Sequence, residues 1–298
     1  MTDQQILIIG ASGRIGTQLQ AELVARGLRP RGATRHPERH RPQQASMPTP
    51  GGTGEDGTTW VRFDLTDPTT YAPALAGVDR VFLAARPGDE HSDAVAGPFI
   101  SAMRHSGVRK VINLTAMGTD QRPDFALRRL ELLLEASGLA WTHLRPNWFF
   151  QVFTEGSLLA GLRGAGTIRL PAADARLSFI DARDVAAVAA VLLADGGHEG
   201  EGLTLTGPAA HDHHEVAEAI GEATGRTMTY EPVEEDEARA SLAAAGFPPA
   251  WQERLVRFYQ LVRAGYCSPV SEAVQRVTGR APIGLARFAR DHAHAWRA

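Results

Sequence analysis

The chain has 298 residues, of which 43% are hydrophobic and 22% are charged, a composition typical of a folded water-soluble protein. The net charge of −3 gives no electrostatic reason to expect nucleic acid or an anionic membrane as a partner. The single cysteine, Cys267, excludes an intramolecular disulfide and a multi-thiolate metal site within one chain. The first residues lack the basic region of a signal peptide, so we expect a cytoplasmic protein. The longest apolar run, Val185 to Ala194, is too short to span a bilayer.

The first 145 residues alternate short apolar runs with helix-like stretches. Strands are predicted at Ile6–Ile9, Pro30–Thr34, Thr59–Arg62, Arg80–Ala85, Lys110–Thr115 and Trp141–Arg145. Helices are predicted at Ile15–Ala25, Tyr71–Ala76, Asp93–Ser106 and Phe125–Ser137. This alternation predicts an α/β fold with a Rossmann-type, doubly wound parallel sheet covered on both faces. Residues His40–Gly57 are rich in Pro, Gly and Thr without periodicity and are predicted to form a surface loop.

The second half is less regular, and helical patterns dominate it. Helices are predicted at Val185–Leu193, Val216–Thr224, Glu234–Ala245, Trp251–Ala264, Pro269–Thr278 and Ile283–Trp296. We therefore expect a dinucleotide-binding domain at residues 1–147 and a smaller, α-rich substrate lobe at 148–298, interleaved with the first domain. Asp184 is predicted to cap its helix. His211, His213 and His214 suggest metal ligands, but Asp212 and Glu215 have capping-box spacing, so no metal site is predicted.

A glycine-rich turn, GASGRIG at residues 10–16, follows the first predicted strand and opens a helix. In this context glycines allow a tight turn, close approach to a pyrophosphate and close packing of the helix on the sheet. The predicted cofactor-binding residues of the turn are Gly10, Ser12, Gly13, Arg14, Ile15 and Gly16. The strand–turn–helix context favours dinucleotide binding over a merely structural turn.

The end of the second strand bears on the choice between NADP(H) and NAD(H). An NAD-specific site usually has an acidic residue there, but this chain has Arg35, and no acid precedes it in Arg29–Thr34. Arg14, inside the glycine turn, is predicted to reach the same corner. Guanidinium groups suit a 2′-phosphate, although a surface arginine is also common, so we predict NADP(H) as the cofactor.

The sequence resembles the NmrA-like group of atypical short-chain dehydrogenases/reductases, which includes quinone and triphenylmethane-dye reductases. The resemblance covers nearly the whole chain. It is carried by GASGRIG, Arg35, Phe63-Asp64-Leu65, VINLTAMG, SGLAWTHLRPNWFFQ at 137–151, LSFIDARDVAAVAA at 177–190 and the C-terminal VSEAVQRVTGRAP. It implies that Asp64 and Leu65 flank the adenine. It implies further cofactor contacts from Ala84, Ala85, Arg86, Thr115, Pro146 and Asn147, and substrate contacts from Met117, Trp148, Phe149 and Phe150.

The crossover VINLTAMGTDQRPDFALRRLELL at 111–133 lacks the catalytic residues of typical family members. Those enzymes use a Tyr-x-x-x-Lys pair here, but the crossover has neither residue, and Lys110 is the only lysine of the chain. Two candidates for a catalytic role remain. Thr115 either donates a hydrogen bond to a substrate carbonyl or simply caps the end of the strand. Asn147 either orients a carboxamide or is a turn residue after Pro146. Arg128 is a ribose ligand or, more simply, a solvated helix residue.

The missing pair favours a conjugated substrate, because a delocalised acceptor takes hydride without a dedicated protein acid. The leading hypothesis is therefore an NADPH-dependent reductase of a conjugated aromatic or quinone-like small molecule. One alternative is a non-catalytic NADP(H)-sensing regulator of the NmrA type, and another is a dinucleotide-binding epimerase or cyclase without net redox turnover. The expected assembly is a monomer or homodimer.

Overall fold

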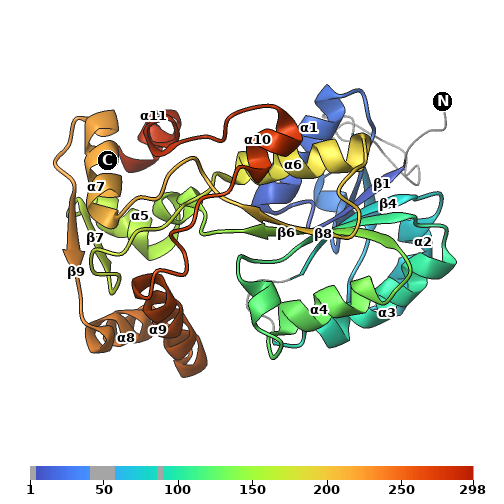
Figure 1. Ribbon diagram of the computed structural model, residues 1–298, viewed down its shortest axis with the longest axis horizontal. Helices are drawn as coiled ribbons and strands as arrows, with labels where there is room; N and C mark the ends of the chain where they lie inside the picture. Colours follow the sequence, from blue (N-terminus) through green and yellow to red (C-terminus); the bar gives the residue numbers. More distant parts are fainter. Residues whose placement is uncertain (1–4, 41–57, 86–89, 298) are drawn as a thin grey trace. The chain divides into compact units, whose positions relative to one another are not determined.

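The structure is a computed structural model that describes residues 5–40, 58–85 and 90–297 (Figure 1). It divides into two compact units. Unit 1 comprises Met1–Pro146 and Ala182–Thr204, and unit 2 comprises Asn147–Asp181 and Leu205–Ala298. The chain thus leaves unit 1 after Pro146 and returns to it for one further helix and strand. Most of the predicted loop His40–Gly57, residues 41–57, lies outside the described residues.

Unit 1 is built on a seven-stranded sheet in the order β3-β2-β1-β4-β5-β6-β8. The strands are β1 (Ile6–Ile9), β2 (Arg31–Thr34), β3 (Thr59–Arg62), β4 (Arg80–Ala84), β5 (Lys110–Leu114), β6 (Ala140–Pro146) and β8 (Glu201–Leu205). The first six pair in parallel. The order reverses between β1 and β4, which is the switch point where Rossmann folds bind ligands. The predicted Rossmann-type α/β fold is confirmed.

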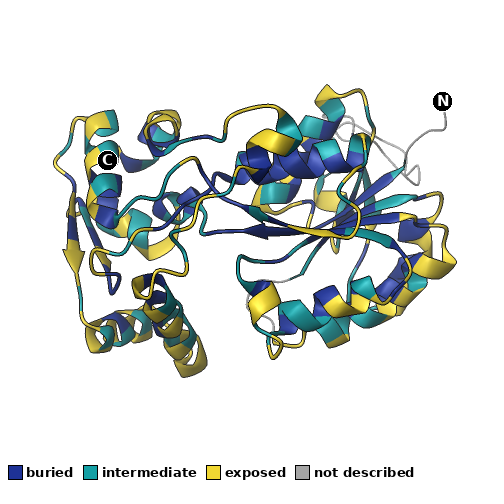
Figure 2. Ribbon diagram, viewed as in Figure 1, coloured by how far each residue is buried: buried dark blue, intermediate teal, exposed yellow. Residues whose placement is uncertain are grey.

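Helices cover both faces of this sheet. They are α1 (Arg14–Ala25), α2 (Tyr71–Leu75), α3 (Ser92–His105), α4 (Ala126–Glu135) and α6 (Ala182–Ala194). Helices α1 and α6 lie on one face, and α2, α3 and α4 lie on the other (Figure 1). Helix α6 is buried along almost its whole length, because its many alanines allow close packing on both sides (Figure 2). It begins at Ala182, so Asp184 lies in its first turn and the prediction that Asp184 caps it is wrong.

Unit 2 combines helices with a small sheet that the helical patterns did not predict. Its elements are α5 (Gly156–Arg163), β7 (Thr167–Leu170), α7 (His213–Thr224), β9 (Thr229–Pro232), α8 (Glu235–Ala244), α9 (Pro249–Arg263), α10 (Ala273–Thr278) and α11 (Leu285–Trp296). Strands β7 and β9 pair in parallel. The predicted cap of α7 is confirmed, since the Asp212 carboxylate accepts a hydrogen bond from the Glu215 amide at 2.9 Å. No helix in the described part of the chain is long and apolar enough to cross a membrane.

Candidate cofactor and substrate site

The glycine turn between β1 and α1 has the tight, close-packed backbone that its glycine spacing predicts. Gly10 has a φ of +79°, which favours glycine. A Cβ on Gly16 would lie 2.2 Å from the Gly10 carbonyl oxygen, so only glycine fits there. Ser12, Gly13 and Arg14 are exposed at the start of α1. No acidic side chain lies in the first turn and no side chain caps it, so its backbone N–H groups suit an anionic ligand.

The residues predicted to contact the adenosine half lie at the ends of neighbouring strands. Arg35 follows β2, is exposed, and forms no ion pair within the described residues. Asp64 and Leu65 follow β3 and are half-buried. The Asp64 carboxylate accepts hydrogen bonds from the amide and hydroxyl of Thr66 at 2.9 and 2.8 Å, which fixes the turn. An unpaired guanidinium at this edge is available for a 2′-phosphate.

The ends of β4, β5 and β6 supply the remaining predicted contacts of unit 1. Ala84 ends β4, and a Cβ on Gly10 would lie 3.4 Å from the Ala84 methyl group, so this end of the strand adjoins the glycine turn. Ala85 follows and is half-buried, whereas Arg86 lies outside the described residues. The Met117 amide donates to the Pro146 carbonyl at 2.9 Å, which ties the loop after β5 to the end of β6.

Thr115 is already engaged within unit 1. Its side chain is buried, and Oγ1 donates to the Glu131 carboxylate at 2.8 Å, with the Leu144 carbonyl a second acceptor at 3.3 Å. A hydroxyl has one proton, so this proton is committed to the protein and only lone pairs are available to a ligand. The geometry therefore supports the strand-end role of Thr115 over a donor role.

Glu131 is the centre of a buried ion-pair network. Arg145 on β6 donates to it from Nε and Nη2 at 3.0 and 2.8 Å, and Arg128 donates at 2.9 Å. Burial acts to raise the pKa of Glu131, but the hydrogen bonds from Arg145 and Thr115 and the charge of Arg145 outweigh it and hold the pKa below its usual value. Arg128 also pairs with Glu135, and Arg145 with Asp120. Arg128 thus pairs with two carboxylates of its own helix, α4. The two roles predicted for it, a ribose ligand and a solvated helix residue, do not include this pairing.

Among the described residues, one group of side chains has ligand atoms close enough together to hold a metal ion: Glu131, Glu135 and His143. The sequence patterns did not predict this group. Both carboxylates already bind guanidinium groups, which compete with a cation. Burial lowers the pKa of His143 to about 4, so its ring is neutral at pH 7. We assign the group to the ion-pair network.

Asn147 opens unit 2, and its amide nitrogen is fully used. Nδ2 lies 2.8 Å from both the Ser178 hydroxyl and the Cys267 carbonyl, and 3.2 Å from the Ser178 carbonyl. The amide oxygen Oδ1 is buried without a hydrogen-bond partner among the described residues. Asn147 therefore joins three chain segments and offers a ligand an acceptor, and it has no free donor.

The aromatic residues after Asn147 have different environments. Trp148 and Phe149 are half-buried. Phe150 is fully buried and stacks with Phe179 and Phe288, with ring centroids 5.5 and 5.0 Å apart. We therefore assign Phe150 to the core of unit 2 and leave it out of the proposed substrate site, which corrects the expectation from the sequence.

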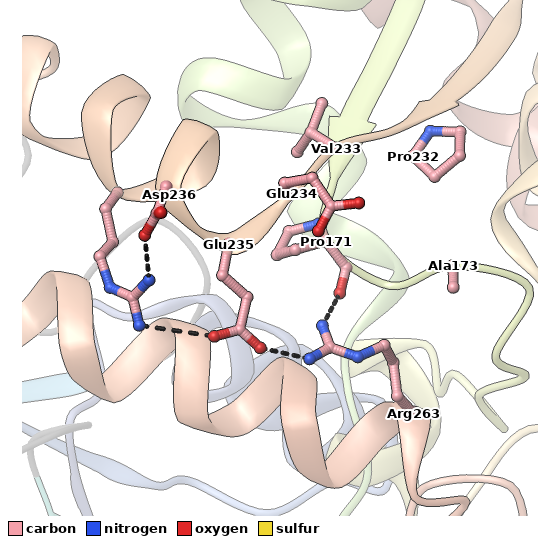
Figure 3. A pocket seen from close by; sticks show the side chains of 9 residues that line it. Pro171, Ala173, Pro232, Val233, Glu234, Glu235, Asp236 and Arg263 are labelled. Atoms are coloured by element: carbon pink, nitrogen blue, oxygen red, sulfur yellow. Dashed lines mark hydrogen bonds and ion pairs between the residues drawn. The ribbon is translucent and has the colours of Figure 1, made fainter.

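A cavity of about 570 Å³ in unit 2 lies between the end of β9, α8 and α9 (Figure 3). Its lining is charged, and Glu235 forms ion pairs with Arg239 and Arg263 there. None of the predicted site residues lines it. Its charged lining does not suit an apolar aromatic ligand.

Comparison with known proteins identifies the family. The family model for NAD(P)H binding matches residues 10–196. The chain belongs to this NAD(P)H-binding family. It is 32% identical to a (4-alkanoyl-5-oxo-2,5-dihydrofuran-3-yl)methyl phosphate reductase of Streptomyces griseus, covering 98% of this chain and 99% of the relative. It is 29% identical to an NAD(P)H azoreductase of Xenophilus azovorans, with the same coverage.

The fold is shared with solved structures at lower identity. A triphenylmethane reductase of Citrobacter sp., crystallised with NADP(H), superposes with a TM-score of 0.80 at 19% identity over 97% of this chain and 99% of that one. NmrA, a negative transcriptional regulator, gives a TM-score of 0.72 at 16% identity over 98% and 95%. The resemblance to NmrA-like proteins is thus confirmed, and so is the expected nicotinamide cofactor. With its reductase relatives, the NAD(P)H-binding chain is an oxidoreductase.

Proposed function

We propose that this protein is an NADPH-dependent reductase that transfers hydride to a conjugated aromatic or quinone-like small molecule. The observation that carries the proposal is the hydrogen bond from Thr115 to Glu131. It commits the proton of the hydroxyl at the end of β5, where the crossover has neither tyrosine nor lysine.

The charges around Thr115 support the same conclusion. Arg128 and Arg145 are paired with Glu131, Glu135 and Asp120, so three carboxylates face two guanidinium groups. This network has no spare positive charge for a localised alkoxide. A conjugated acceptor spreads the incoming charge over its rings and needs less stabilisation at one atom.

The residues present fit NADPH, which supplies the hydride when bound. The glycine turn and the first turn of α1 would hold the pyrophosphate. Arg35, with Arg14, would bind the 2′-phosphate. Asp64, Leu65, Ala84 and Ala85 would line the adenosine and ribose, and Met117, Pro146 and Asn147 would border the nicotinamide. Trp148 and Phe149 would contact the substrate. The azoreductase relative and a quinone oxidoreductase of Escherichia coli, 26% identical over 67% of this chain, act on conjugated acceptors by name.

The test separates a reductase from a sensor. NADPH binding is measured by calorimetry, and NADPH oxidation is then measured with naphthoquinone, an azo dye and a cationic triphenylmethane dye. The proposal predicts tight binding and oxidation that depends on the acceptor. Tight binding without oxidation by any acceptor would instead identify a sensor. Conversion of a nucleotide sugar without net NADPH consumption would identify an epimerase.

A further inference from the structure

Tyr259, on α9 of unit 2, has an unusual hydroxyl. Two other buried tyrosines each have a backbone partner for the hydroxyl. Tyr71 donates to the Leu65 carbonyl at 2.6 Å, and Tyr230 donates to the Leu170 carbonyl at 3.0 Å. Tyr259 is only 4% exposed, yet its hydroxyl makes no hydrogen bond to any described residue. Buried phenols usually find a partner, so this donor is available to a ligand or to solvent. Burial raises the pKa of Tyr259, which keeps the phenol protonated at neutral pH.

A second unpartnered polar group lies on Asn147, the residue that precedes Trp148 in the chain. Asn147 is 4% exposed, and its Oδ1 has no hydrogen-bond partner among the described residues. Trp148 follows Asn147 in the chain, and its ring centroid lies 5.3 Å from that of Tyr259 at an interplanar angle of 41°. The free acceptor is thus carried by the residue before Trp148, and the free donor by a tyrosine whose ring packs against the Trp148 indole. One such group can be an accident of packing, but two on residues linked through Trp148 favour a ligand site in this part of unit 2.

The residues around Trp148 are held in place by contacts within unit 2. Asn147 Nδ2 donates to the Cys267 carbonyl at 2.8 Å, and Trp148 and Cys267 both pack against the hydrophobic core of unit 2. Cys267 follows the end of α9, the helix that carries Tyr259. Phe258 on that helix also meets the Trp148 ring edge-to-face, with centroids 6.5 Å apart. This group is therefore preorganised, which lowers the entropy cost of binding a flat ring.

We infer that Tyr259 contacts the substrate, its hydroxyl donating a hydrogen bond to the oxygen or nitrogen acceptor atom of an aromatic ring that packs beside Trp148. This inference rests on the proposed reductase function. The hydrogen bond strengthens as negative charge grows on the acceptor atom, so it contributes to turnover as well as to binding.

The test is Tyr259→Phe, which removes the hydroxyl and keeps the ring. The matched control is Tyr230→Phe, because the Tyr230 hydroxyl has a structural partner in Leu170. Three quantities are measured for each variant: the melting temperature, the affinity for NADPH, and the affinity for naphthoquinone of protein saturated with NADP⁺. The kcat/KM for naphthoquinone reduction is measured alongside them.

Tyr259→Phe is expected to weaken naphthoquinone binding and kcat/KM by about tenfold, with no loss of melting temperature or NADPH affinity. Tyr230→Phe is expected to lower the melting temperature and leave naphthoquinone binding unchanged. If Tyr259→Phe leaves both naphthoquinone readouts unchanged, or lowers the melting temperature as Tyr230→Phe does, the inference is overturned. A wild-type protein that binds no naphthoquinone also overturns it. Weaker naphthoquinone binding in a protein without turnover keeps the inference and rejects the reductase function.

Discussion

Thr115 at the end of β5 donates its hydroxyl proton to Glu131 on α4, across 2.8 Å. The same carboxylate receives two hydrogen bonds from Arg145 on β6. One buried anion therefore joins two adjacent strand ends to the helix of the crossover. A structural role of this kind explains a polar residue at the strand end without assigning it to proton transfer.

Replacing Thr115 with valine keeps the shape of the side chain and removes the hydroxyl. We expect kcat for naphthoquinone to fall by less than about tenfold, because the committed proton takes no part in the reaction. General acid catalysis would contribute about 100- to 10,000-fold, so steady-state kinetics separate the two cases. Thr115→Ser retains the hydrogen bond to Glu131 and is the control. A loss of about a thousandfold in the valine variant alone would make Thr115 the proton donor.

Arg35→Ala is expected to weaken NADPH binding by about 2 kcal/mol and to change NADH binding little. Only NADPH carries the 2′-phosphate that an unpaired guanidinium at the end of β2 would bind. Calorimetric titration of both cofactors measures the difference. Arg29→Ala, an equally exposed arginine before the other end of β2, serves as the control. Equal weakening of both cofactors by Arg35→Ala would show that Arg35 has no role in choosing between them.

Gly16→Ala tests the fit of the glycine turn. The added Cβ would lie 2.2 Å from the Gly10 carbonyl oxygen, a backbone atom, so the turn must shift. We expect a stability loss of about 1–3 kcal/mol in urea unfolding, together with weaker NADPH binding. Gly97→Ala in α3 is the control, since its nearest neighbour is a side-chain carbon 3.9 Å away. An unchanged Gly16→Ala protein would mean that the turn has more room than this geometry allows.

His213 at the start of α7 makes stability depend on pH. Its ring is buried against Phe153, Phe179 and Tyr230, and burial lowers its pKa to about 4. The unfolded chain takes up a proton near pH 6.5, which the folded chain resists, so stability falls as the pH drops from about 6.5 towards 4. We expect a loss of about 2 kcal/mol from this residue between about pH 7 and pH 5.

The His213 effect is measured by urea unfolding at both pH values in His213→Phe, which keeps an aromatic ring and removes the titrating group. The exposed neighbour His214 provides the control variant, His214→Phe. His143, also buried with a pKa of about 4, should retain part of the acid sensitivity in both variants. A His213→Phe protein with the full wild-type pH dependence would show that His213 is not its source.

The sequence predicted six of the seven strands of the main sheet, and the clearest of them are buried on both faces and appear as apolar runs, as in ILII of β1 and VFLA of β4. Strand β8 was missed because only two of its five residues are apolar. Strands β7 and β9 were missed because each has only four residues, too few for an alternating pattern to be recognised among the helical patterns of this half of the chain. The glycine turn was found from local spacing alone. Glu131 was missed because a charged residue on an amphipathic helix usually faces solvent, and its partner Arg145 on β6 becomes a neighbour only in the fold.

The most direct test of the account compares a conjugated with an unconjugated acceptor. On one preparation of the wild-type protein, kcat/KM for NADPH oxidation is measured with naphthoquinone and with cyclohexanone. The Thr115–Glu131 bond and the paired arginines give a localised alkoxide no donor at the end of β5, so we predict rapid oxidation with naphthoquinone and none with cyclohexanone. Comparable rates with both acceptors would contradict the account, because they would show that reduction does not depend on a conjugated acceptor.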